Sequence, residues 1–270
     1  MKKKIKIDRK KLILILLTVI LIILVIIYGI IIKHKIQQRN FANKNINTYQ
    51  NNEKPIFEIE KIILCSSASA IDLSEEKNLQ NLSIYQYTDI AVYLKNGEEL
   101  SNKNTIKDLY IDNISLEGID SIGKKSLTYK NILKFGLKQE ILQAKETQDI
   151  HFKVLHTNQE NQEAEYEEPV FYTDCSNPIT LEYLNYDIVT GFKMDENNSV
   201  SFDGSILKSA GIKKKDIECK IKFKINIINN DDEKYSCPIN FKIPLSDIFT
   251  GTTMKARNLE GKQYTFFREN

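Results

Sequence analysis

Among the residues of this chain, three lysines at alternate positions are the best candidates for binding a ligand: Lys220, Lys222 and Lys224. In a β-strand these positions point to one side, and the following segment adds Lys234 and Lys242. A row of ammonium groups attracts anions such as a wall polymer or a lipid headgroup, and salt weakens that attraction. The simpler interpretation is a solvated face that keeps a sheet soluble.

The cysteines and histidines form no recognisable catalytic or metal-binding motif. Cys65, Cys175, Cys219 and Cys237 lack the close Cys-x-x-Cys spacing of zinc and redox sites. The histidines at positions 151 and 156 are separated by an odd number, so on one strand they face opposite sides. We therefore expect no catalytic site, no metal site and no cofactor. The cysteines form either two disulfides or four buried thiols, and their spacing does not choose between these states.

An almost unbroken apolar run from Leu12 to Ile32 predicts a transmembrane helix. At about 1.5 Å per residue, the run spans roughly 31 Å, which matches the hydrocarbon core of a bilayer. It is longer than the apolar region of a cleaved signal peptide, and no small-residue cleavage motif follows closely, so we expect an uncleaved signal anchor. Seven cationic residues precede the run and four follow it, which predicts a cytoplasmic N-terminus.

Composition divides the chain into four parts. Residues 1–11 are a basic cytoplasmic stub, residues 12–32 are the transmembrane helix, residues 33–55 are an Asn-rich tether, and residues 56–270 are the extracytoplasmic domain. Positions 41–270 hold 28 cationic and 35 acidic residues, and this acidic balance argues against a nucleic-acid partner. An acidic loop at 158–168 is where the extracytoplasmic domain would divide if it contained two subdomains.

The layout of a single N-terminal anchor, a β-rich domain and the fragment Tyr172-Thr173-Asp174-Cys175 resembles that of the sortases, which are wall-linked transpeptidases. That resemblance implies a cysteine nucleophile, with a histidine well upstream and an arginine shortly after it. This chain has no arginine between Arg39 and Arg257, and its histidines lie close to the cysteine. A sortase-like cell-wall enzyme is therefore the remote alternative, because a cysteine without these partners is usually structural.

Short β-rich segments separated by turn residues predict an all-β sandwich with one or two short helices in its connections. The expected strands are 56–66, 84–94, 106–116, 150–155, 170–173, 179–189, 200–202, 217–228, 235–245 and 264–267. Three segments are candidates for these helices: 74–82, 138–146 and 205–210. In the segments starting at 217 and 235 every odd residue is apolar, so these side chains, including Phe223, should enter the core. A turn at 229–232 would place Cys219 opposite about residue 242, too far from Cys237 for a disulfide.

These observations predict a single-pass protein of the cell membrane, with the bulk of its chain extracytoplasmic. The abundance of Ile, Lys and Asn and the scarcity of Ala and Arg indicate AT-rich codons, as in a low-GC Gram-positive bacterium. The expected function is a non-enzymatic interaction or structural module of the cell envelope, and the alternative is a binding module for an anionic wall polymer or small ligand. The expected partners are the lipid bilayer, through Leu12 to Ile32, and either an envelope protein or that polymer.

Overall fold

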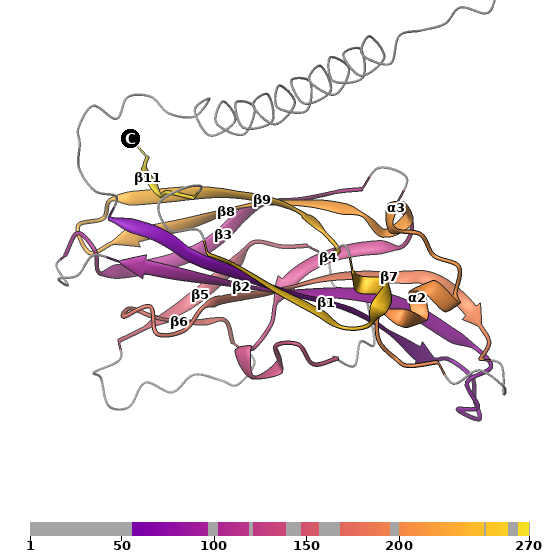
Figure 1. The fold of residues 1–270 in the computed structure, drawn as a ribbon. Coiled ribbons are helices and arrows are strands. Elements are labelled where there is room, and N and C mark those ends of the chain that lie inside the picture. Colours follow the sequence, from indigo (N-terminus) through magenta and orange to yellow (C-terminus); the bar gives the residue numbers. More distant parts are fainter. Residues whose placement is uncertain are drawn as a thin grey trace, which may run out of the picture. The chain divides into compact units, whose positions relative to one another are not determined.

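The computed structural model describes residues 56–96, 102–118, 121–138, 147–156, 168–194, 200–245, 247–258 and 264–269. Within these residues β-strands dominate and form two sheets (Figure 1). The transmembrane helix predicted for residues 12–32 and nearly all of the helix predicted for 138–146 lie outside the described residues. In the described part of the chain, no helix is long and apolar enough to cross a membrane.

The first sheet is built on three long antiparallel strands, β1 (Phe57–Asp72), β2 (Leu82–Asn96) and β7 (Ile179–Phe192). The shorter strands β10 (Thr253–Asn258) and β4 (Lys124–Tyr129) form its edges, in the order β10-β1-β2-β7-β4. The long strands are rich in the β-branched and aromatic residues that suit a pleated sheet.

The second sheet has the order β11-β9-β8-β3-β5-β6. Its strands are β3 (Ile106–Glu117), β5 (Ile150–Leu155), β6 (Val170–Tyr172), β8 (Cys219–Asn229), β9 (Lys234–Ile243) and β11 (Phe267–Arg268). Strands β5 and β6 pair in parallel, and the other pairs of this sheet are antiparallel. The odd residues of β8 are all buried, which confirms the alternation predicted from the sequence.

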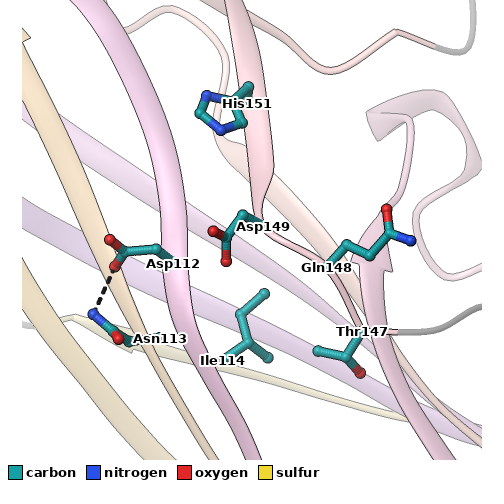
Figure 2. Close-up of a pocket in the computed structure, with 7 residues that line it drawn as sticks. All are labelled: Asp112, Asn113, Ile114, Thr147, Gln148, Asp149 and His151. Carbon is teal, nitrogen blue, oxygen red and sulfur yellow. Dashed lines mark hydrogen bonds between the residues drawn. The ribbon is translucent and has the colours of Figure 1, made fainter.

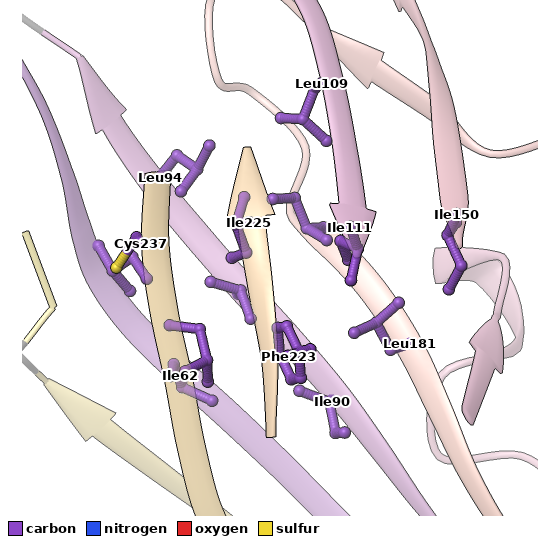
Figure 3. Packing of buried hydrophobic residues seen from close by; sticks show 14 of the residues in the cluster. Ile62, Ile90, Leu94, Leu109, Ile111, Ile150, Leu181, Phe223, Ile225 and Cys237 are labelled. Atoms are coloured by element: carbon purple, nitrogen blue, oxygen red, sulfur yellow. The ribbon is translucent and has the colours of Figure 1, made fainter. Parts of the chain in front are cut away.

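The two sheets pack face to face, so the described residues form a β-sandwich-like all-β fold. Ile62, Ile90 and Leu181 of the first sheet share one hydrophobic core with Phe223 and Ile225 of the second sheet (Figure 3). This core includes residues that precede and residues that follow the segment 158–168 in sequence. The division of the domain at that segment stays a prediction.

Helices cover the part of the first sheet that the second sheet does not reach. These short helices are α2 (Ser205–Ser209), α3 (Lys214–Ile217) and η2 (Ile248–Thr250). Their buried apolar side chains form a second core with Ala68 and Ala70 of β1 and Ile84 of β2. The helices contribute Ile206, Leu207, Ile217 and Ile248 to this core. The helix predicted for 205–210 is confirmed as α2 and is followed by Gly211 at φ +74°, a left-handed conformation that glycine adopts at low cost. A further turn, η1 (Ile132–Lys134), follows β4.

The helix predicted for 74–82 is wrong. The carboxylate of Asp72 accepts hydrogen bonds from the backbone nitrogens of Ser74 and Leu79, at 2.9 and 2.8 Å. These bonds fold the segment into a turn in which Lys77 and Leu79 have positive φ angles. A side chain that caps local backbone groups competes with a helix, and here it stabilises the connection between β1 and β2.

Other boundaries predicted from the sequence are also wrong. Residues 200–202 do not form a strand, and β4 and β10 were not predicted. Strand β1 continues to Asp72 rather than ending at Ser66, although its last part is built mainly of Ser and Ala. Hydrogen bonding to β2 along its length sustains this extension, because pairing in a sheet overrides weak β-propensity.

Candidate functional site

Lys220, Lys222 and Lys224 of β8, here called the lysine stripe, lie on the outer face of the second sheet, where neighbouring strands supply carboxylates. Lys222 forms an ion pair with Glu117 of β3. The ammonium of Lys224 lies 3.1 Å from a carboxylate oxygen of Glu269 and 3.9 Å from one of Asp112. Two of the three lysines proposed as an anion site are therefore already neutralised by acidic neighbours.

Glu269 is a shared acceptor at one edge of this face. It accepts hydrogen bonds from Ser236 at 2.7 Å and from Lys224 at 3.1 Å, and it pairs with Lys234 at 2.8 Å. Burial raises the pKa of Glu269, but these hydrogen bonds outweigh burial and lower the pKa to about 2. The hydrogen bond to Glu269 in turn raises the pKa of Lys234 above its ordinary value. Both groups therefore stay charged at neutral pH.

Lys220 has a different environment at the other end of the stripe. It lies opposite Lys242 on β9 and opposite Glu117 on β3. Within the described residues, neither Lys220 nor Lys242 forms an ion pair of its own, and Lys242 is exposed. Facing like charges repel, so this end of the sheet is where an anion would be most favoured.

A polar depression opens between β3 and β5, with a volume of about 720 Å³ (Figure 2). It is lined by Asp112, Asn113, Ile114, Thr147, Gln148, Asp149 and His151. The register of β3 shifts here, and Asn113 adopts φ +53°, so the strand bulges beside the depression. The ring of His151 stacks on Tyr110, with centroids 5.3 Å apart.

The chemistry of this depression is that of a small polar binding site. Its two carboxylates and imidazole could hold a cationic or hydrogen-bonding group. Among the residues that the structure describes, no cluster of His, Cys, Asp and Glu is suited to a metal ion. Sequence reasoning considered His151 as a metal ligand and as a sortase-type histidine, but it did not place Asp112 beside it, because only the β3–β5 pairing brings Asp112 close to Asp149 and His151.

A buried ionic cluster on the first sheet was also missed by sequence reasoning. Lys130, directly after β4, contacts Asp89 of β2 and Glu182 of β7. The side chains of all three residues are at most 1% exposed. The sequence signal is weak but present, since each carboxylate lies inside a strand in which more than half of the residues are apolar.

The four cysteines all lie in described residues and all are free thiols. Cys219 pairs across the sheet with Ile243, and Cys237 pairs with Ile225, so the prediction that these cysteines are not bonded to each other is confirmed. Burial and, to a smaller extent, the nearby carboxylate of Asp174 raise the pKa of Cys175 to about 12. A thiol that stays protonated is the opposite of what a cysteine nucleophile requires.

Comparisons with protein-family models, with curated proteins and with solved structures found no match for this chain.

Proposed function

We propose that this chain is a single-pass membrane protein whose extracytoplasmic β-sandwich acts as a non-enzymatic structural or interaction module of the cell envelope. The apolar run from Leu12 to Ile32 supports an anchor, and the excess of cations before the run supports a cytoplasmic N-terminus. The Asn-rich tether at 33–55 separates the anchor from the β-sandwich.

The internal pairing of charges on the outer face of the second sheet carries this proposal. Lys222 is held by Glu117, and Lys224 and Lys234 are held by Glu269. Charges matched in this way leave only a weak field to attract a polyanion, while they fix side chains on the outer face of the sheet. Such a surface suits a scaffold or a protein contact better than a polymer-binding groove.

Two experiments in source cells test the topology and the interaction. Protease added to intact protoplasts is expected to remove the sandwich and leave a short protected stub, whereas survival of the full-length chain would contradict the topology. Cross-linking in intact cells is expected to join the sandwich to an envelope protein. Recovery of wall polymer alone, with no protein, would favour the alternative function.

The alternative is a module that binds an anionic wall polymer or small ligand at the stripe of Lys220, Lys222 and Lys224. The facing lysines Lys220 and Lys242 are the specific observation in its favour. The two proposals differ in a measurable way, because anion binding through lysines weakens as salt rises.

The matched test replaces Lys220, Lys222 and Lys224 together with Gln. A control variant makes the same change at three exposed lysines next to or within α3, Lys213, Lys214 and Lys215. Both variants lose three positive charges, so only a local site distinguishes them. We expect wild type and both variants to sediment equally with purified cell wall and anionic vesicles at low and moderate salt. Loss of binding in the stripe variant alone would establish the alternative.

A further inference from the structure

A row of cross-strand partners crosses the first sheet on the side that faces away from the second sheet. Cys65 of β1 lies opposite Asp89 of β2, and Asp89 lies opposite Glu182 of β7. Thr128 of β4 lies opposite Glu182 from the other side. Lys130, two residues further along, extends from the edge of the sheet over β7 to reach Asp89.

The ammonium nitrogen of Lys130 is held by close contacts on all sides. It donates to the two carboxylate oxygens of Asp89 at 2.8 and 2.9 Å and to Oε1 of Glu182 at 2.8 Å. The backbone carbonyl of Leu137 accepts from it at 2.9 Å. The backbone nitrogen of Gly136 donates to Asp89 at 2.5 Å, so the segment after η1 closes over the cluster.

This cluster places two negative charges and one positive charge where water is excluded. Desolvation penalises each charge, and the attraction between them repays that penalty only in part. Burial raises the pKa of Asp89, while the ammonium of Lys130 opposes the rise. Where water is excluded, a neutral amine beside a neutral carboxylic acid lies closer in free energy to the ion pair than it does in water.

An amine, a carboxylic acid and a second carboxylate in contact are the reactants and the proton carrier of an amide condensation. We propose that Lys130 and Asp89 join in an intramolecular isopeptide bond in the mature protein, with Glu182 transferring protons between the reacting atoms. The bond crosses β7 and fixes the edge strand β4 to β2.

The condensation balances without any co-reactant. The lone pair of the Lys130 amine attacks Cγ of Asp89, so a nitrogen–carbon bond forms. Glu182 accepts a proton from that nitrogen and passes it to the departing hydroxyl group of Asp89. The carbon–oxygen bond then breaks and one water leaves. Glu182 returns to its starting state, and no oxidant or reductant takes part.

Position and burial both favour this reaction. Holding two reacting groups in contact can be equivalent to an effective concentration on the order of 10⁵–10⁸ M. In bulk water, hydration stabilises the separate ammonium and carboxylate, but here that hydration is lost. The product removes two buried charges and keeps one N–H that can donate to Glu182. The bond would also stabilise the sheet in a domain whose cysteines are all free thiols.

Mass spectrometry of the full chain, denatured after purification in detergent, tests the proposal directly. We expect an intact mass lower by one water than the sequence mass. A tryptic digest should contain residues 78–95, with Asp89, joined to residues 126–134, with an uncleaved Lys130. A folded wild-type chain that keeps its full mass after prolonged incubation overturns the proposal, whatever the variants do.

Three variants and a control identify the reacting groups. Lys130→Met and Glu182→Gln should retain the full sequence mass, and protease resistance would show that each is folded. Asp89→Asn should condense with loss of ammonia instead of water, which gives the same product and the same mass as linked wild type. The control Lys124→Met alters an exposed lysine of β4 and should still lose water. Water loss that persists in Lys130→Met would overturn the assignment of the bond.

Discussion

Replacing Phe223 with Ala is expected to lower the free energy of unfolding by about 3–5 kcal/mol, as large-to-small core substitutions do. Phe223 lies in the middle of β8 and is 2% exposed. Its ring faces Ile62 and Ile90 of the opposite sheet (Figure 3). It also packs edge-on against Phe241 of β9, with ring centroids 6.2 Å apart.

The expected magnitude has three sources. Returning a buried Phe side chain to water costs about 1.5–3 kcal/mol. Loss of the aromatic pair with Phe241 adds about 0.5–1.5 kcal/mol. The remainder comes from the cavity, because hydrogen bonds on both sides hold β8 in its sheet and limit collapse around the vacated space.

Urea unfolding of the full chain in detergent measures this change, with Lys242→Ala as the control. Lys242 is exposed on the outer face of the same sheet, so its substitution should shift the free energy of unfolding by less than about 0.5 kcal/mol. An unchanged urea slope in both variants would show that the unfolded states are alike. Equal stability of the two variants would refute the assignment of odd β8 residues to the core.

Three further predictions concern backbone fit, acid stability and thiol state. Gly204→Ala should destabilise the fold, because the new Cβ would lie 1.9 Å from the carbonyl oxygen of Ile248, whereas Gly211→Asn meets open space and should lower the melting temperature less, since only its φ of +74° opposes the change. The pKa of Glu269 falls from 4.5 to about 2 on folding, so its contribution to stability is present above pH 4.5 and is lost as the pH falls toward 2. In Glu269→Gln, the free energy of unfolding should therefore depend less on pH between 4.5 and 2. Alkylation without reductant should label all four cysteines after denaturation, and a 219–237 bridge in peptide maps would contradict the free thiols.

The β8–β9 pair shows how far the sequence alone could lead. Apolar residues alternate with polar ones in both segments of the sequence, so the buried side of both strands could be predicted. The register was wrong by one residue, since Cys219 lies opposite Ile243 rather than residue 242. The Asn229 side chain accepts from the backbone nitrogens of Asp231 and Glu233, which centres the turn on Asp231 and not between 230 and 231.

Edge strands were harder to predict because few of their side chains are buried. In β4 only Leu127 and Ser126 are buried, so the segment shows no apolar alternation. The counter-ions of the lysine stripe were hidden for another reason. Glu117 and Glu269 are far from β8 in sequence. They contact its lysines only after β3 has paired with β8 and the residue that follows β11 has packed beside Lys224. The sequence could therefore predict which way the lysines point but not that acidic groups neutralise them.

The buried cluster of Lys130, Asp89 and Glu182 could be predicted only in part. Asp89 and Glu182 each place a charge in a long strand that is rich in buried residues, and a buried charge needs a partner because burying it alone is very costly. That argument predicts that partners exist without identifying them. The partner Lys130 is 41 residues from Asp89 and 52 from Glu182. Only the register of β2, β7 and β4 brings the three together, and no local pattern determines it. Charges inside apolar strands are therefore the places where sequence reasoning should look for chemistry, and pairing between distant strands decides which chemistry is present.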